Sequence, residues 1–306
     1  MITDIPTAAE FHNAGLNMLY MAWEIAVDLV SDLDQIEDMG GAIEGEEDEA
    51  AYWSKAQPAL SNAFGLIQQA MEMALKARIA SVSPYLLIDR NPKDWPGTPD
   101  KKDVPFSEFR TLDAADLVKV HNTFRPDTLS DDFRTFFDEV RRQRNVLMHS
   151  VPKQNFAAGT LVGHVLTAAK HLYSERRWPE HCVYMVNQSR FAAVGVGIDS
   201  TMNSVLRQVD VAIRSLSPAD AKGFFGFEKR RAYVCPVCWD QADHDYQDSW
   251  PRLAQLTEKT ATANKLHCVV CAATSPVERA KCLKPTCEGN VIAEGMCLTC
   301  LSYQDA

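Results

Sequence analysis

The chain has 306 residues, 46% of them hydrophobic and 24% charged, and its formal net charge is −10. This apolar content can fill a core, which excludes a disordered chain, and the length suggests one large domain or two ordinary ones. The acidic balance excludes a protein that coats nucleic acid by its overall charge, so any such contact must use local basic patches such as 141–144 or 228–231.

The N-terminal residues lack the basic start and apolar run of a secretory signal. The best apolar stretch, 191–198, is too short to cross a bilayer. We therefore expect a cytoplasmic protein that makes no membrane contact.

The first 216 residues are predicted to be helical. Apolar residues recur at helical spacing over 7–33 and 50–80, with Pro58 as an expected break or kink in the second stretch. Further helices are expected over 107–122, from 130 or 131 to 149, over 155–174 and over 179–216. Gly195 and Gly197 are candidates for an interruption of the last helix. Because no useful stretch alternates with period two, the predicted fold class is all-α, a bundle of five or six helices.

The composition changes after Ser217, where the helical period fades and turn residues gather around cysteines. We place the domain boundary at 217–232. The chain is thus divided into a helical domain, 1–216, and a cysteine-rich domain, 217–306, which is a candidate tandem of two small modules.

Eight of the nine cysteines form four close pairs in the last third of the chain: Cys235 and Cys238, Cys268 and Cys271, Cys282 and Cys287, and Cys297 and Cys300. Disulfides are disfavoured in the cytosol. In three pairs the C-x-x-C spacing lets one tight turn present two thiolates to a tetrahedral ion. The pattern predicts two structural zinc ions held by eight thiolates, with no open position for catalysis. Cys182 is expected to be a small core residue.

The simplest arrangement joins consecutive pairs, and a cross-braced arrangement of first with third and second with fourth stays open. His244 and His267 are possible substitute ligands. A thiol–disulfide function would need βαβ surroundings, which this part of the chain lacks. Five basic residues would permit, without requiring, contact with nucleic acid: Lys229, Arg230, Arg231, Lys281 and Lys284. The six tryptophans are scattered and predict no base-stacking platform.

The expected helix at 131–149 carries an arginine in an unusual place. At about 100° per residue its apolar side chains gather on one arc: Phe133, Phe136, Phe137, Val140, Leu147 and Met148. Arg144 lies near the middle of that arc, which is costly unless the guanidinium is paired or faces a polar cleft. Asn145 and His149 are spaced i, i+4 and share an adjacent face.

Arginine suits a phosphate, and histidine exchanges protons near neutral pH, so these three residues are candidates for a catalytic site. Structural roles are the alternative. Arg144 would then form an internal salt bridge or extend past its apolar neighbours, and His149 would cap the end of the helix.

The six residues RNVLMH, from Arg144 to His149, resemble the R-x(4–6)-H motif of the HEPN superfamily, in which a polar residue follows the arginine as Asn145 does. The place of the motif late in a helical bundle is similar too, and the long helix that ends with residues 72–88 resembles the family's second helix. The resemblance covers residues from about 7 to 175 or 216. The segments 43–50 and 89–105 look like insertions, and the cysteine-rich part looks like an added module.

This resemblance implies a metal-independent endoribonuclease that acts as a homodimer, with Arg144, Asn145 and His149 of both subunits in a cleft at the two-fold interface. It implies attack of a ribose 2′-hydroxyl on the neighbouring phosphate, with His149 as general base or acid, Arg144 stabilising the phosphorane, and Asn145 binding the phosphate or orienting the histidine. The products would be a 2′,3′-cyclic phosphate and a 5′-hydroxyl. The implied role is a toxin or effector of a bacterial toxin–antitoxin or anti-phage system, with an antitoxin or regulatory protein as a possible partner.

Two other functions compete with the ribonuclease. One is a non-catalytic HEPN scaffold that binds RNA or protein, and the other is a zinc-ribbon adaptor whose helical part only dimerises. The intact set of Arg144, Asn145 and His149 favours the ribonuclease.

Overall fold

The computed structural model describes residues 1–38, 46–89, 93, 95–96, 102–149, 155–189, 201–244 and 250–304. It is mostly helical, with two groups of four cysteines in its C-terminal part, as the sequence predicts. Parts of the expected insertions at 43–50 and 89–105, and the expected interruption at Gly195 and Gly197, lie outside the described residues. None of the described helices combines the length and apolarity that a membrane span requires.

The chain divides into two compact units, Met1–Glu175 and Arg176–Ala306. The boundary predicted at 217–232 follows the change of composition, whereas the units divide before the last helices of the predicted bundle. The reason is that these helices bond to the cysteine-rich segment. Arg177 donates to the carbonyl oxygens of Val269 and Val270, and Asn203 exchanges two hydrogen bonds with the backbone of Asp243.

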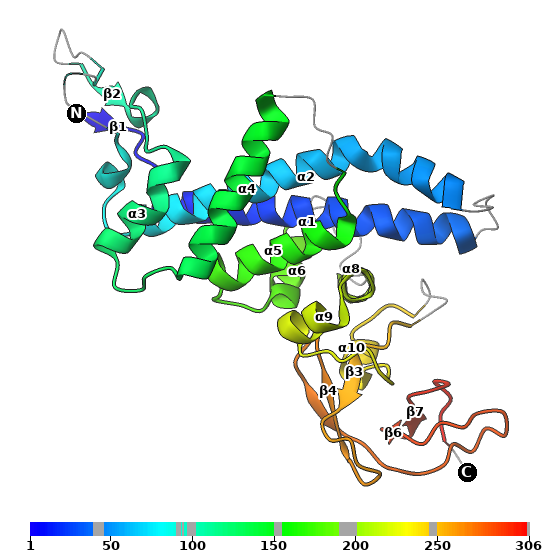
Figure 1. The fold of residues 1–306 in the computed structure, drawn as a ribbon. Coiled ribbons are helices and arrows are strands. Elements are labelled where there is room, and N and C mark those ends of the chain that lie inside the picture. The colour runs from blue at the N-terminus through cyan, green and yellow to red at the C-terminus, as the bar shows by residue number, and fades with distance from the viewer. Residues whose placement is uncertain are drawn as a thin grey trace. The chain divides into compact units, whose positions relative to one another are not determined.

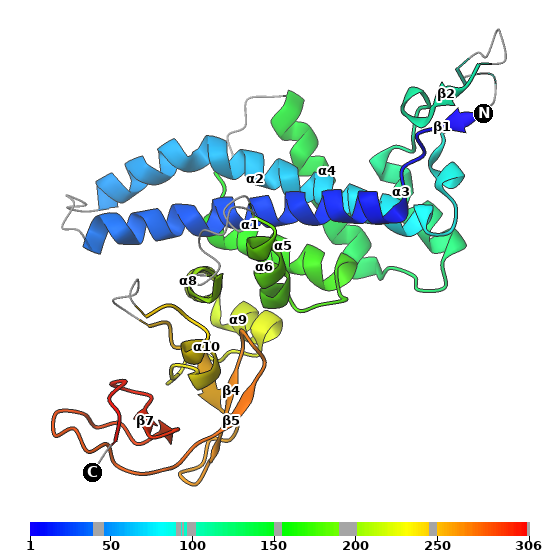
Figure 2. The same cartoon turned by 180° about the vertical axis from the view of Figure 1, so that it is seen from behind.

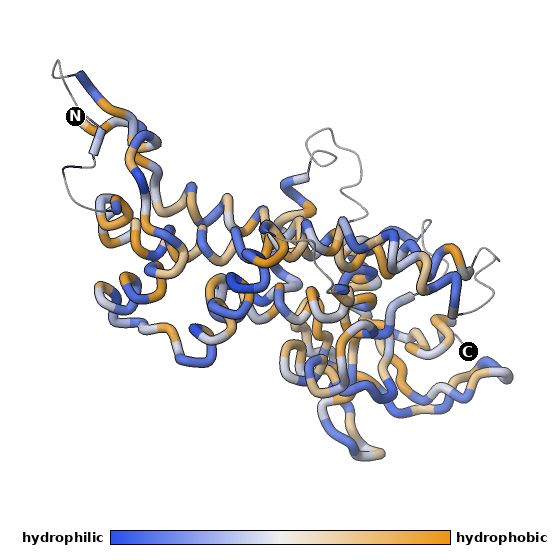
Figure 3. Tube along the Cα trace, turned by 45° about the horizontal axis from the view of Figure 1, so that its top comes forward, coloured by the Kyte–Doolittle hydropathy of each residue, from blue (hydrophilic) through white to orange (hydrophobic). Residues whose placement is uncertain are grey.

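The first unit is built on a helical hairpin of α1 (Ala8–Asp38) and α2 (Glu46–Ala80), which run side by side in opposite directions (Figures 1 and 2). Thr7 and Glu10 form a capping box at the start of α1, because each side chain accepts a hydrogen bond from the other residue's backbone N–H. The predicted break at Pro58 does not end α2, which continues through it. Hydrophobic and hydrophilic residues are interspersed along the helices (Figure 3).

Between α2 and α3 the chain forms short elements. They are the 3-10 turns η1 (Pro84–Leu87) and η3 (Phe106–Glu108), and the strand β2 (Val104–Pro105), which pairs in parallel with β1 (Ile2–Thr3) before α1. Helix α3 (Ala114–Phe124) begins later than the predicted residue 107. The residues before it are held extended, because the N–H of Leu112 donates to Leu87 and the N–H of Asp89 donates to Arg110.

Helix α4 (Asp131–His149) has the predicted bounds, and α5 (Ala158–Leu172) follows it. Phe133, Phe137 and Val140 are buried and anchor the first half of α4 in the core of this unit. The second half does not continue that burial: Met148, expected on the apolar arc, is 63% exposed.

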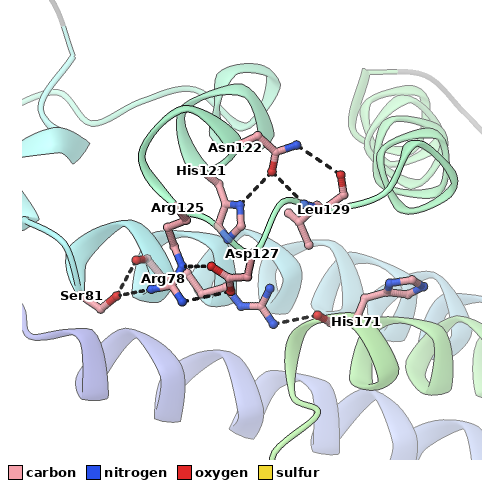
Figure 4. A network of polar contacts seen from close by, with 8 residues as sticks. All are labelled: Arg78, Ser81, His121, Asn122, Arg125, Asp127, Leu129 and His171. Carbon is pink, nitrogen blue, oxygen red and sulfur yellow. Dashed lines mark hydrogen bonds and ion pairs between the residues drawn. The ribbon is translucent and has the colours of Figure 1, made fainter.

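A polar network fixes the turn that leads into α4 (Figure 4). The guanidinium of Arg125 binds the carboxylate of Asp127 at 2.7 and 3.0 Å and donates to Ser81 at the end of α2. Asn122 brackets the backbone of Leu129, accepting from its N–H and donating to its carbonyl. The hydrogen bond from Arg125 lowers the pKa of Asp127 to about 2, so the pair stays charged near neutral pH. The turn that leads into α4 is therefore tied to the end of α2.

The second unit begins with helices and ends with short strands. The predicted helix at 179–216 corresponds to α6 (Trp178–Asn187) and α8 (Thr201–Ser215), with α9 (Pro218–Phe225) and α10 (Pro236–Asp240) after them. Strands β3 (Ala254–Leu256), β4 (Lys265–Cys268) and β5 (Thr274–Pro276) form an antiparallel sheet in that order. Strands β6 (Ile292–Ala293) and β7 (Met296–Cys297) form a separate hairpin.

Candidate metal centres and candidate nucleic-acid site

The eight paired cysteines gather into two groups of four, each of which could hold a metal ion. The first group is Cys235, Cys238, Cys268 and Cys271, and the second is Cys282, Cys287, Cys297 and Cys300. Consecutive pairs therefore meet, and the cross-braced arrangement is not what the structure has. Within each group the four Sγ atoms lie within 4.8 Å of one another, and six of the eight thiols are buried.

Backbone amides support the sulfurs of both groups. The N–H of Val270 donates to Cys268 Sγ at 3.4 Å, and that of Gly289 donates to Cys287 Sγ at 3.3 Å. Similar bonds run from Cys238 to Cys235 and from Lys284 to Cys282. Such N–H···S bonds stabilise thiolates, which is the form that binds metal.

The second turn of each group has the same backbone. In the first group the N–H of Ala272 donates to Cys268 and that of Cys268 donates to Ala273; in the second the N–H of Leu301 donates to Cys297 and that of Cys297 donates to Ser302. Ala272 and Leu301 both have φ of 59°, the left-handed region that glycine usually occupies. The C-terminal part thus contains two hairpins with the same backbone bonds, one in each cysteine group.

Thiols so close together cannot titrate independently. Hydrogen bonds to Cys235, Cys238 and Cys268 lower the pKa of Cys271, and the same group of contacts raises the pKa of Cys238. A cation at the centre would favour the thiolate form of all four.

The other candidate ligands lie outside the two groups. His244 Nε2 is 2.8 Å from the carbonyl oxygen of Trp239, and His267 Nδ1 is 3.2 Å from Thr274 Oγ1. Cys182 is fully buried in α6, as expected of a core residue.

A shallow depression of about 660 Å³ lies along the second half of α4. We call it the His149 depression, and six residues line it: Asp138, Arg141, Arg142, Asn145, Val146 and His149. Asn145 and His149 are exposed and one helical turn apart, so an amide and an imidazole open onto the same space. Val146 is 50% exposed beside them.

Arg144 does not line this depression. On an α-helix it is about 140° around the axis from His149, whereas Asn145 is only about 40° away. Phe137 and Val140 form a buried stripe on α4, and Arg144 lies one helical turn beyond Val140, where this stripe ends. The side chain of Arg144 is half-buried. None of the described residues pairs with its guanidinium, so an internal salt bridge within the described part of the chain does not account for it.

Two other arginines supply the positive charge at the depression. Arg141 lies 3.5 Å from Asp138, and Arg142 makes a bidentate pair with Glu139 at 2.6 and 3.0 Å. Hydrogen bonds from Arg142 and Gln143 hold the pKa of Glu139 below its ordinary value, so this pair is charged at neutral pH. These ion pairs are i, i+3 contacts at the surface, so a phosphate can compete with the carboxylates for the two guanidinium groups.

An aromatic cluster lies next to the first cysteine group. Trp239 follows Cys238 directly, and its ring lies 4.2 Å from that of Trp250 and 4.3 Å from that of His244. The expectation that the tryptophans are scattered is therefore wrong for this pair. The one signal in the sequence is a tryptophan on each side of the segment that follows the first C-x-x-C pair.

Comparison with known proteins gives no relative from which a function could be transferred. No family model, no curated protein and no solved structure matches this chain.

Proposed function

We propose that this protein is a metal-independent endoribonuclease of the HEPN type whose C-terminal unit is held together by two structural zinc ions. The observation that carries the nuclease proposal is the exposure of Asn145 and His149 on one side of α4, in an open depression that Arg141 and Arg142 also line. An imidazole, an amide and guanidinium groups are what a phosphodiester needs for binding and proton transfer.

The reaction needs no group beyond the protein, the RNA and water. His149 accepts the proton of a ribose 2′-hydroxyl as its oxygen attacks the adjacent phosphorus, and water protonates the departing 5′-oxygen; alternatively His149 donates the proton to the 5′-oxygen and water accepts that of the hydroxyl. The phosphorus–O5′ bond breaks as the new bond forms, which leaves a 2′,3′-cyclic phosphate and a 5′-hydroxyl. Asn145 hydrogen-bonds the phosphate or orients the imidazole, and Arg144 stabilises negative charge on the non-bridging oxygens.

A second copy of the chain completes the proposed site. Because Arg144 and His149 of one helix point to different sides, a phosphate at His149 is better reached by Arg144 of a partner subunit. Exposed apolar side chains lie on both of these sides, Val146 on the side of His149 and Met148 on the side of Arg144, and each offers an apolar contact to a partner. The proposed active form is therefore a homodimer.

Zinc is the proposed occupant of both cysteine groups. A tetrahedral ion with Zn–S bonds of about 2.3 Å separates its sulfurs by about 3.8 Å. The closest Sγ pairs in the first group are 3.7 Å apart, and those in the second are 3.7 and 3.9 Å apart. With four thiolates around each ion no position is open, so the proposed role of zinc is to hold the hairpins folded.

The biological role proposed here follows from the resemblance in the sequence. The protein would act in the cytoplasm as a toxin or as an effector of anti-phage defence, restrained by an antitoxin or another regulatory protein. If it binds RNA without cutting it, the alternative is a HEPN scaffold with a zinc-ribbon adaptor.

Digestion of RNA in the presence of EDTA tests the nuclease proposal. We expect cleavage to survive chelation, to leave cyclic phosphate ends, and to fall at least about 100-fold in His149→Ala and in Arg144→Ala. His244 of the second unit is also an exposed histidine, so His244→Ala serves as the control and should keep full activity. Cleavage unchanged in both His149→Ala and Arg144→Ala would remove the site assignment, and tight RNA binding without cleavage would favour the scaffold.

A further inference from the structure

A second depression lies on the same helix, between α3 and α4. It has a volume of about 410 Å³, and we call it the Lys119 depression. Its lining includes Lys119 from α3 and Arg134 and Asp138 from α4. Asp138 lines both depressions, so the two are neighbours along α4.

The lining of the Lys119 depression is suited to a phosphate. Lys119 is exposed, and none of the described residues forms an ion pair with it. Among the residues that the structure describes, the guanidinium of Arg134 pairs only with Asp131, at 3.0 Å, and the two side chains are 60% and 87% exposed. Such an exposed i, i+3 pair is weak and leaves the guanidinium available to a ligand. The one carboxylate in the lining, that of Asp138, lies 3.5 Å from Arg141, which offsets its charge.

Helical geometry places the two depressions in line. Arg134, Asp138, Arg142 and His149 fall within about 80° of one another around the axis of α4. Arg134 and His149 are separated along the axis by about 22 Å at 1.5 Å per residue. At about 3.4 Å for each nucleotide of a stacked strand, this distance is spanned by roughly six nucleotides.

We propose that the Lys119 depression binds a backbone phosphate of the same RNA strand that reacts at His149, so that the strand follows α4. This inference rests on the proposed nuclease function and adds a positioning site to it. Lys119 and Arg134 hold the strand away from the reacting phosphate, so they contribute to the binding of long RNA and not to the chemical step.

The length of the RNA separates this role from a general effect of charge. We would measure the affinity of two 2′-O-methyl oligonucleotides, a 3-mer and a 15-mer, which cannot be cleaved because the attacking hydroxyl is blocked. In the double variant Lys119→Ala/Arg134→Ala, we expect the 15-mer to bind about tenfold more weakly, with the salt dependence of log affinity reduced by about 1.4 for two lost phosphate contacts. The 3-mer should bind as it does to the wild type.

Two further variants sharpen the test. Lys55→Ala/Lys170→Ala removes the same charge from exposed positions elsewhere in the first unit and should leave binding of the 15-mer unchanged. Asp131→Asn removes the carboxylate that pairs with Arg134 and should strengthen binding of the 15-mer. All these side chains are exposed, so the variants are expected to fold.

The outcomes distinguish the two proposals. If the wild type cleaves RNA but Lys119→Ala/Arg134→Ala binds the 15-mer as tightly as the wild type, the Lys119 depression has no such role and the nuclease function stands. An equal loss of affinity in Lys55→Ala/Lys170→Ala would also overturn the local contact. If the wild type neither binds the 15-mer nor cleaves RNA, the proposed function and the inference fall together.

Discussion

The hydroxyl of Tyr173 donates a 2.9 Å hydrogen bond to the backbone carbonyl of Ala70, and so ties the residue after α5 to the middle of α2. The bond is buried and passes Gly15 of α1, where an added Cβ would meet the hydroxyl and lie 2.9 Å from the carbonyl oxygen. Three helices therefore meet at a point where only glycine fits.

Gly15→Ala should lower the free energy of unfolding by about 1–3 kcal/mol, the usual range for a methyl group forced into a packed core. Urea denaturation measures it. The matched control is Gly65→Ala in the interior of α2, where a Cβ would meet nothing within 4 Å. That change should be neutral or stabilise by up to about 1 kcal/mol, because alanine favours the helix. Equal losses in the two variants would contradict the account.

Gly289→Ala is expected to empty the second cysteine group alone. A Cβ at this position would lie 2.7 Å from Cys297 Sγ and 2.8 Å from the side chain of Thr299, so the turn cannot close around an ion. Metal analysis of purified protein should give about two ions per chain for the wild type and about one for Gly289→Ala. Gly223→Ala in α9, where a Cβ has free space, should keep both. Two ions in Gly289→Ala would show that the turn adapts.

The first group should release its ion faster in Arg177→Ala. Arg177 donates to the carbonyl oxygens of Val269 and Val270, at 3.0 and 2.9 Å, and braces the hairpin of Cys268 and Cys271 against α6. Losing two bonds from a charged donor should speed release about tenfold, measured by transfer of metal to a coloured chelator.

A matched variant at the second group makes this test specific. Arg252 donates to the carbonyl oxygen of Thr299 at 3.0 Å, so Arg252→Ala should speed only the other phase of release. If both variants affect the same phase, the two groups do not exchange metal separately.

His164 should make the stability of the first unit depend on pH. Burial lowers its pKa, its ring packs against Phe64 and Phe136, and its Nδ1 finds no hydrogen-bond partner in the part of the chain that the structure describes. Above the ordinary histidine pKa of about 6.5 it is neutral in both states. Below that pH, His164 takes up a proton in the unfolded chain but not in the folded chain. The free energy of unfolding therefore decreases as the pH falls toward the lowered pKa of His164 in the folded state.

Unfolding by urea at a series of pH values between 7.5 and about 5 would reveal this loss. His164→Phe removes the titrating group while keeping a ring in the same apolar site, so its stability should fall less over the same interval. An identical slope in wild type and His164→Phe would assign the effect to other groups.

The cysteine groups could be predicted because the spacing of the cysteines along the sequence is typical of metal ligands. Two thiols with two or four residues between them can turn toward one ion, so the ligands are local in the sequence and only the partner pair must be found. The bounds of α4 could also be predicted, since Ser130 caps its start and accepts a hydrogen bond from the N–H of Phe133.

Other features depend on contacts that spacing does not encode. Arg177 and Asn203 bond to residues far along the chain, within the second unit, and these contacts depend on the fold. The pairing of Trp239 with Trp250 depends on the fold of the segment between them. The helical wheel placed Arg144 correctly on the apolar stripe, but it could not say that the core ends at Val140, which leaves the arginine half-buried and Met148 exposed.

The matching bonds of the two cysteine hairpins form in spite of different side chains between the paired thiols. The residues between the paired thiols are Val269 and Val270 in one hairpin and Leu298 and Thr299 in the other, yet the backbone closes in the same way and reaches the same φ of 59° at Ala272 and Leu301. What the two hairpins share is therefore the path of the backbone and the thiols, and not the side chains between them.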